Sequence, residues 1–185
     1  MKIHWNRFNI YLSAVLTSLL LCGCLSAESK AKHQSSEVRL HLEMTGQQGG
    51  STQVPIYRDN PVMINVEHDA FLTEGSMAEA RVIEAVGGFA ISIRFDRRGS
   101  WLLEQYTGSN KGKRLAVFAQ FVSPYNPKLS PGRWLAAPII SQRITDGILR
   151  FTGDLSIEEA HSFVRGLNNV AHKNGTDKEE NSSWW

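Results

Sequence analysis

Apolar and polar residues alternate with a period of two through much of the central chain. In residues 37–44 every second side chain is apolar, which predicts a strand with one buried and one solvated face. The polar positions of this strand are Glu37, Arg39, His41 and Glu43. Weaker patterns predict strands at residues 53–57 and 62–66, and apolar runs predict a central strand at residues 114–122 and another strand at 148–153.

A pair of glycines marks the clearest hairpin of the sequence. Residues 80–86 and 89–95 are apolar-rich segments separated by Gly87 and Gly88. Glycine accepts the positive φ angles that the tightest hairpin turns require. We therefore expect the two segments to pair through a turn made by these glycines.

Three segments predict helices. Residues 73–80 indicate a short helix, and residues 101–108, entered through the segment from Asp96 to Gly99, indicate a helix of about three turns. Further along, Ser156 is a favourable N-cap, and Glu159 three residues later completes a capping box. The apolar stripe of this last helix consists of Ile157, Ala160, Phe163, Val164, Leu167 and Val170.

Two acidic-glycine clusters before the last helix raise the question of a metal or phosphate site. The clusters are Thr145-Asp146-Gly147 and Thr152-Gly153-Asp154. A calcium loop needs oxygen ligands at alternating positions, and a phosphate loop needs a lysine entering a helix. Asp146 and Asp154 are instead separated by a strand about 20 Å long, and neither cluster contains a lysine. We therefore interpret Gly147 and Gly153 as turn positions that bound one strand.

These elements predict an α+β fold, with a mixed, largely antiparallel sheet and two main helices packed on one of its faces. The folded unit is expected to span residues 37–171. Residues 24–36 and 172–185 are polar and lack periodicity, which predicts a flexible tether and a disordered tail ending in Trp184 and Trp185. The positions expected to define turns and helix starts are Gly87, Gly88, Gly99, Gly147, Gly153, Ser156 and Glu159.

The first residues resemble a bacterial lipoprotein signal. After a basic start, residues 10–21 form an apolar run that is shorter than the roughly 20 residues of a membrane span. The run leads into a lipobox-like Leu-Cys-Gly-Cys sequence, so residues 1–23 would be removed and Cys24 lipidated. Each buried lipid methylene contributes roughly 0.8 kcal/mol to membrane binding. Ordinary secretory cleavage after Ala27 is the alternative.

The same resemblance predicts a periplasm-facing position in the cell envelope. Leu25, beside the lipidated cysteine, is not the aspartate that commonly retains lipoproteins in the inner membrane, so the outer membrane is slightly favoured by analogy. Removal of Cys22 and lipidation of Cys24 leave no free thiol, which excludes disulfides and cysteine chemistry in the mature chain.

Charge and polar clusters add no further chemistry. The chain has 20 basic and 18 acidic residues, and loss of Lys2 and Arg7 leaves 18 of each. A balanced chain has no long-range attraction for nucleic acid, and residues 111–114 are interpreted as a solvated basic loop. No pair of histidines has metal-ligand spacing. The scattered histidines are His33, His41, His68, His161 and His172.

No catalytic motif stands out either. A Gly-x-Ser-x-Gly motif is missing from the sequence, and the one Ser-x-x-Lys match lies in the polar segment of residues 24–36, which is not a nucleophile context. Asp96, beside Arg97 and Arg98, is a candidate general base. The helix that follows favours instead a role for Asp96 as the N-cap of that helix. We therefore expect a protein that is not an enzyme and that carries no cofactor or metal.

Three segments resemble one known family. They are "FLTEGSMAEARVIEA" (71–85), "FAISIRFDRRGSWLLEQYTGSNKGKRLAVFAQF" (89–121) and "PIISQRITDGILRFTGDLSIEEAHSFVRGL" (138–167). In order and spacing they are similar to the periplasmic head of SecD and SecDF, and the resemblance spans residues 61–167. It implies a domain that contacts unfolded chains emerging from the translocon. The family's transmembrane helices have no counterpart here, a proline-rich insertion replaces a tight turn, and the end of the last helix is less rich in leucine.

The proline-rich loop at residues 123–132 is the expected partner-binding surface. Tyr125 and Trp134 flank it, and exposed aromatic residues on a rigid loop often mark interfaces. Packing of Trp134 beneath the loop is the equal alternative, and an exposed strand edge that pairs with an extended chain is a second route. The sequence thus predicts a lipid-anchored, non-enzymatic module that assists protein export by binding translocon components or unfolded polypeptide. A scaffold for an envelope partner unrelated to Sec is the alternative, and the oligomeric state is not predicted.

Overall fold

The computed structural model describes residues 33–46, 50–126 and 132–182. The expectations for residues 1–32, including Cys24, and for Trp184 and Trp185 lie outside this range. The described residues from Ser35 onwards form one compact unit. Its elements are β1 (Ser36–Leu42), β2 (Ser51–Ile56), β3 (Val62–Glu67), β4 (Leu72–Thr73), the 3₁₀ turn η1 (Glu74–Ser76), β5 (Met77–Ala85), β6 (Gly88–Phe95), α2 (Arg97–Ser109), β7 (Leu115–Phe121), β8 (Gly132–Ala136), β9 (Ile148–Phe151) and α3 (Ile157–Ser182).

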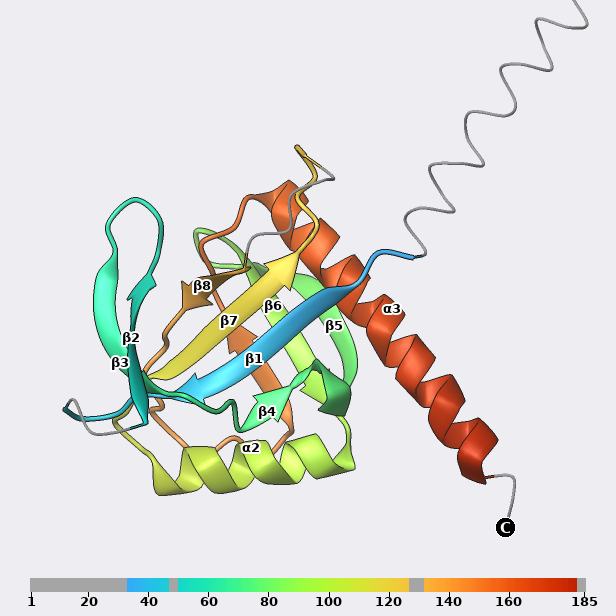
Figure 1. Cartoon of the computed structure of the whole chain (residues 1–185), viewed down its shortest axis with the longest axis horizontal. Helices are drawn as coiled ribbons and strands as arrows, with labels where there is room; N and C mark the ends of the chain where they lie inside the picture. Colours follow the sequence, from blue (N-terminus) through green and yellow to red (C-terminus); the bar gives the residue numbers. More distant parts are fainter. Residues whose placement is uncertain (1–32, 47–49, 127–131, 183–185) are drawn as a thin grey trace, which may run out of the picture. The chain divides into compact units, whose positions relative to one another are not determined.

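The fold is α+β, as predicted, but its strands form three sheets. A four-stranded sheet has the order β4-β1-β7-β8, a three-stranded sheet has the order β5-β6-β9, and β2 and β3 form a separate hairpin. Every strand pair in the described residues is antiparallel. Helix α3 packs against β5, β1 and β7, and α2 packs against β6 and β4 (Figure 1).

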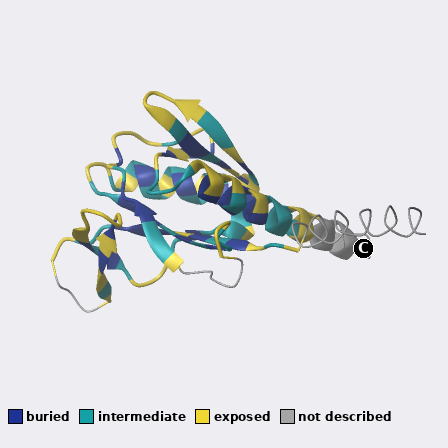
Figure 2. Cartoon of the chain, turned by 90° about the horizontal axis from the view of Figure 1, so that it is seen from above, coloured by how far each residue is buried: buried dark blue, intermediate teal, exposed yellow. Residues whose placement is uncertain are grey.

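The main hydrophobic core contains residues from both larger sheets and both helices. It includes Val38 and Leu40 of β1, Ile91 and Ile93 of β6, and Phe163 of α3, all fully buried. Buried positions are found on both the strands and the helices (Figure 2). The alternating pattern of β1 and the stripe of α3 supply these positions because one face of each element turns inward. The buried stripe of α3 is shorter than predicted, because its first expected member, Ile157, is 40 % exposed.

A second, smaller core lies where β1 was expected to face solvent. Its buried residues are Val54, Ile56, Ile64, Val66, Ala116 and Ala137, with Trp134 packed against them. The β2–β3 hairpin therefore covers part of the four-stranded sheet, and the prediction that His41 is solvated is wrong. His41 is buried, and its Nδ1 lies 2.9 Å from the Glu67 carbonyl oxygen. Burial lowers the pKa of His41, because a charged imidazolium loses hydration there.

The β5–β6 hairpin forms as predicted, but with a different turn. Ala85 pairs with Gly88, so the two-residue loop is Val86 and Gly87. Both glycines have positive φ angles, 82° for Gly87 and 152° for Gly88, whereas Val86 does not. The turn is thus not the doubly positive type that a pair of loop glycines favours, and Gly88 begins β6.

The predicted short helix at residues 73–80 is wrong beyond one 3₁₀ turn. Residues 74–76 form η1, and Met77 then begins β5, which pairs with β6. Pairing with β6 and burial of Met77 and Ala80 outweigh the helical tendency of the short segment.

Both helices begin at side-chain caps. Asp96 Oδ1 accepts from Gly99 N–H at 2.8 Å at the start of α2. At the start of α3, Ser156 Oγ accepts from Glu159 N–H at 3.2 Å, and Glu159 Oε2 accepts from Ser156 N–H at 2.9 Å. A Cβ on Gly99 would overlap the Ser76 carbonyl, which explains the need for glycine there.

Helix α3 continues through Ser182 into the segment expected to be an unstructured tail. The expected boundary at residue 171 therefore lies within α3. None of the helices in the described part of the chain is both long and apolar enough to cross a membrane.

The two acidic-glycine clusters lie at opposite ends of β9. Asp146 Oδ1 accepts from Ile148 N–H at 3.0 Å, next to Gly147 with its φ of 66°. Gly153, in contrast, does not have a positive φ. A Cβ there would press on Phe151 and Leu135, so Gly153 allows a close approach rather than a turn.

Candidate functional site

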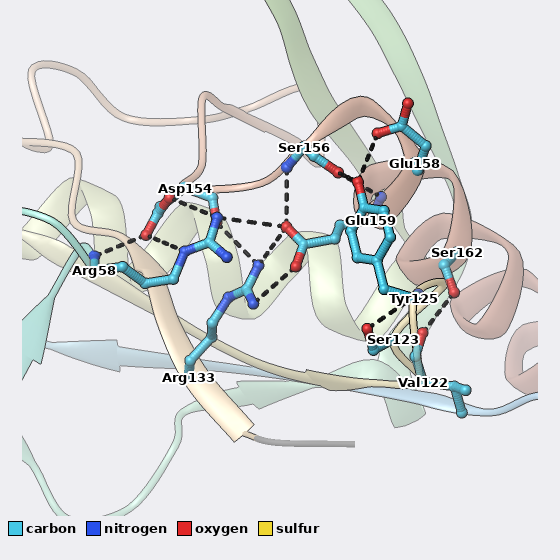
Figure 3. A network of polar contacts seen from close by, with 10 residues as sticks. All are labelled: Arg58, Val122, Ser123, Tyr125, Arg133, Asp154, Ser156, Glu158, Glu159 and Ser162. Carbon is cyan, nitrogen blue, oxygen red and sulfur yellow. Dashed lines mark hydrogen bonds and ion pairs between the residues drawn. The ribbon is translucent and has the colours of Figure 1, made fainter. Parts of the chain in front are cut away.

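The buried Glu159 and the partly buried Arg133 form an ion pair between β8 and the first turn of α3. Two guanidinium nitrogens of Arg133 donate to the two carboxylate oxygens of Glu159, at 3.0 and 2.8 Å (Figure 3). The same guanidinium donates to the Asp154 carbonyl at 3.1 Å. The Glu159 side chain is only 6 % exposed. Bidentate geometry in such a site gives both strength and direction, so the pair fixes the start of α3 against the sheet.

Arg58 extends this network to the β2–β3 hairpin. Its main-chain N–H donates to Asp154 Oδ2 at 2.8 Å, and its guanidinium donates to both Asp154 carboxylate oxygens at 3.1 Å. A guanidinium nitrogen of Arg58 also lies 3.5 Å from Oε2 of Glu159. The neighbouring Tyr57 has a φ of 72°, the one positive value among described residues other than glycine. Asp154 therefore fastens the hairpin to the corner before α3.

The arginines decide the charge state of the two carboxylates. Burial by itself raises the pKa of Glu159, but hydrogen bonds from Arg133 and Ser156, with the charges of Arg133 and Arg58, outweigh it and lower the pKa. Burial also acts against ionisation of Asp154, and the hydrogen bonds from Arg58 reverse that effect and lower its pKa. Both groups are thus held as carboxylates, which suits anchoring and not proton transfer near neutral pH.

Tyr125 lies exposed at the edge of this network. Its ring side chain is on the surface, with the residue 68 % exposed. Its hydroxyl lies 3.0 Å from Ser156 Oγ and donates to Glu158 Oε2 at 3.1 Å. Ser162 Oγ of α3 donates to the Val122 carbonyl at 2.7 Å. The start of the proline-rich loop is therefore attached to α3 and presents an aromatic face outward, whereas residues 127–131 of the loop lie outside the described range.

Trp134 lies in a different environment from Tyr125. Its ring packs edge-on against His41, with ring centroids 5.1 Å apart, and against Phe118 at 5.3 Å. It is half-buried and contributes to the small core under the β2–β3 hairpin. Trp134 therefore packs on the small core under the β2–β3 hairpin, and Tyr125 is the more exposed of the two residues.

The sequence of this domain matches a known protein family. Residues 51–171 match the family described as the P1 head subdomain of SecDF. The chain belongs to this family. The match begins at β2 and ends within α3, so it includes both larger sheets except β1, together with the complete Arg58–Asp154–Arg133–Glu159 network.

Two relatives of the P1 head are named translocase subunits. The chain is 30 % identical over 101 residues to the protein translocase subunit SecD of Calditerrivibrio nitroreducens, covering 54 % of this chain and 17 % of that protein. It is 34 % identical over 94 residues to the protein translocase subunit SecDF of Thermus thermophilus, covering 50 % of this chain and 11 % of that protein. The chain thus spans less than a fifth of either relative.

Solved structures of SecDF share the fold. One, described as a membrane component that enhances protein export, aligns with a TM-score of 0.51 at 21 % identity, covering 78 % of this chain and 67 % of that one. A second, SecDF in a super-membrane-facing form, gives a TM-score of 0.52 at 22 % identity, covering 76 % of this chain and 20 % of that one. At this identity the likeness concerns the fold of the P1 head.

The remaining candidate residues of this P1 head do not converge. Asp96 caps α2, and Asp146 forms an ion pair with Arg150 at 3.1 Å. Within the described residues, no group of three or more histidine, cysteine, aspartate or glutamate side chains gathers as metal ligands. Arg114 donates to the Ala137 carbonyl at 3.1 Å, so the basic loop is partly used in packing.

No pattern in the sequence pointed to Arg58 or Arg133. Arg58 and Asp154 are 96 positions apart, and Arg133 and Glu159 are 26 apart. Neither arginine lies in a local motif. The capping box was the one local pattern that pointed to this network. It holds the Glu159 carboxylate at a fixed position at the start of α3, where a cationic side chain from another strand can reach it.

Proposed function

We propose that this protein is a lipid-anchored protein of the bacterial cell envelope whose SecDF P1 head contacts extended polypeptides or translocon components during protein export. The observation that carries the proposal is the family match across residues 51–171. The two relatives are subunits of the protein translocase. In this proposal the head acts by binding, without covalent chemistry.

The anchor in this proposal is lipid on Cys24. The residues from Cys24 up to the start of β1 at Ser36 form the tether that carries the head on the periplasmic side of a membrane, and residues 1–23 are the signal that is removed. Leu25 alone favours the outer membrane, by analogy. Replacing Cys24 with alanine should abolish incorporation of radiolabelled palmitate and release the chain from the membrane fraction. Unchanged labelling in the variant would contradict lipidation at this residue.

The exposed ring of Tyr125 is the proposed point of contact with a partner. Its hydroxyl is tethered to the first turn of α3, so the ring is held at a fixed position, which lowers the entropic cost of binding. Trp134 does not share this role, because its ring is packed against His41 and Phe118.

In-cell photo-crosslinking tests the proposal. A photoreactive phenylalanine analogue at Tyr125 is compared with the same analogue at Trp101, which is 59 % exposed on α2. Crosslinks from position 125 to secretory precursors or Sec subunits, with none from position 101, are expected. A blank at position 125 would count against the proposal. Crosslinks to an envelope complex without Sec subunits would favour the scaffold function instead.

A further inference from the structure

The outer edge of β9 has backbone groups directed away from its sheet. Strand β9 is the last strand of the three-stranded sheet and pairs on one side with β6. Phe95 N–H on β6 donates to the Gly147 carbonyl at 3.0 Å. Because bonded and non-bonded pairs alternate along an antiparallel ladder, Leu149 directs its backbone groups to β6. Arg150 therefore directs its N–H and C=O outward.

The backbone of Arg150 is open at this edge. In the described part of the chain, no residue donates to its carbonyl or accepts from its N–H. The preceding outward N–H, that of Ile148, is satisfied by Asp146 Oδ1 at 3.0 Å. One outward donor and one outward acceptor thus remain on the same residue, which is the arrangement that an antiparallel neighbour satisfies with two hydrogen bonds.

The chain covers comparable positions on other strands with side chains. On β5, the side-chain amide of Asn168 bonds both the N–H and the carbonyl of Ala80, at 2.8 and 2.9 Å. On β1, Glu74 Oε2 accepts from Val38 N–H at 3.1 Å. Exposed edges invite unwanted pairing and are normally blocked in this way. The outward N–H and carbonyl of Arg150 therefore differ from the backbone groups of Ala80 and Val38, which side chains of the same domain cover.

A groove runs along this open edge. It has a volume of about 400 Å³ and lies between β9 and residues 138–146, within the size range of protein binding pockets. The far wall presents Ile139, which is 57 % exposed, and Ile144. That wall is fixed to the body, because Ile140 N–H donates to the Lys113 carbonyl at 2.9 Å and Ile144 N–H donates to Thr107 Oγ1 at 3.0 Å.

The charges in the groove are already paired. A guanidinium nitrogen of Arg143 lies 2.5 Å from a carboxylate oxygen of Glu104, and a guanidinium nitrogen of Arg150 lies 3.1 Å from a carboxylate oxygen of Asp146. The groove therefore offers no free arginine to an anionic ligand such as a phosphate group. What it offers is one backbone donor and acceptor beside an apolar wall, which is complementary to an extended chain with apolar side chains at alternate positions.

We propose that an extended polypeptide segment enters this groove and adds to β9 as an antiparallel strand, with a pair of backbone hydrogen bonds at Arg150. The proposal rests on the proposed function, since it names the place where the P1 head holds an extended chain. Binding through backbone groups accepts many sequences, because every residue other than proline carries the same donor and acceptor.

The test compares Arg150→Pro with Arg150→Ala in the full-length mature chain. Proline removes the outward N–H and leaves the ladder to β6 intact, and both variants lose the side chain. The probe is a reduced and alkylated, fluorescently labelled secretory protein, titrated by fluorescence anisotropy. Arg150→Ala should bind within about twofold of the wild type, and Arg150→Pro about fivefold or more weakly, the loss expected for one backbone hydrogen bond.

The binding measurements separate failure of the β9 proposal from failure of the proposed function. Equal affinities of the two variants would overturn the β9 proposal and leave the proposed function standing. Failure of the wild type to bind the unfolded probe would contradict the proposed function as well. Loss of self-association by Arg150→Pro in sedimentation, with probe binding unchanged, would assign the edge to a second copy of this chain and overturn the proposal.

Hydrogen exchange on the wild type gives an independent measurement, which decides the question if Arg150→Pro does not fold. The Arg150 amide should exchange rapidly in the free protein, because none of the described residues accepts from it, and its exchange should slow about tenfold or more when the unfolded probe is bound. An exchange rate at Arg150 that stays the same on saturation with the probe would overturn the proposal.

Discussion

The side chain of Asn168 forms two hydrogen bonds with the backbone of Ala80. Its Oδ1 accepts from the Ala80 N–H at 2.8 Å, and its Nδ2 donates to the Ala80 carbonyl at 2.9 Å. Residue 80 is buried on the edge strand β5, and residue 168 is on α3. The amide thus takes the place of a neighbouring strand and connects the helix to the sheet.

Replacing Asn168 should therefore destabilise the fold. Asn168→Ala leaves the buried N–H and carbonyl of Ala80 without partners, and the free energy of unfolding should fall by about 1–3 kcal/mol. Asn168→Asp keeps an acceptor for the N–H but loses the donor. Chemical denaturation measures both. A wild-type midpoint for Asn168→Ala would show that this contact does not stabilise the fold.

A matched pair of glycines tests the packing of α3 on β1. A Cβ on Gly166 would overlap the Ser36 hydroxyl, whereas a Cβ on Gly175 meets nothing within 4 Å. Gly166→Ala should lower the free energy of unfolding by about 1–3 kcal/mol, as overpacking does. Gly175→Ala should leave it unchanged or raise it by up to about 1 kcal/mol through helix propensity. Equal effects of the two substitutions would contradict the close crossing of α3 over Ser36.

The partly buried Arg133 should contribute more to stability than the exposed Arg150. Arg133→Met leaves the Glu159 carboxylate buried without its bidentate partner, and the free energy of unfolding should fall by about 3 kcal/mol. Arg150→Met is the control, because the Arg150–Asp146 pair is exposed on both sides and should contribute no more than about 1 kcal/mol. Thermal and urea denaturation measure both variants, and a larger loss for Arg150→Met would contradict the assignment.

Acid should weaken the same network. The pKa values of Asp154 and Glu159 are lowered in the folded state from ordinary values of 3.8 and 4.5. A carboxylate with a depressed folded pKa stabilises the fold above its unfolded pKa and loses that contribution as the pH falls through the folded value. The free energy of unfolding should therefore drop below about pH 4.5. Arg133→Met should flatten this drop, and an unchanged pH profile in that variant would be the contrary result.

Local patterns predicted the parts of the fold that depend on neighbouring residues. The hairpin of β5 and β6, the strand β7 and the capping box of α3 each follow from residues close together in sequence. The predictions from local sequence patterns were wrong where long-range contacts determine the secondary structure or the burial of a residue. Met77 and Ala80 join a strand because β6 lies beside them, and His41 is buried because the β2–β3 hairpin covers its face.

The candidate site was predicted less well than the fold. Tyr125 is exposed, whereas Trp134 packs in the small core against Phe118 of the neighbouring strand β7 and against His41 of β1, which is distant in sequence. The open edge of β9 depends on the alternation of its ladder with β6, which is fixed by the Phe95–Gly147 hydrogen bond. Sequence alone does not show which residues of an edge strand face outward.

The proposed function requires the P1 head to bind extended polypeptide in preference to folded protein. The most direct measurement is the affinity of the full-length mature chain for one secretory protein in two states, native and reduced and alkylated, by anisotropy titration. Binding to the unfolded state at least about tenfold tighter, a difference of about 1.4 kcal/mol, is predicted. Equal affinity for the two states, or no binding to either, would contradict the claim.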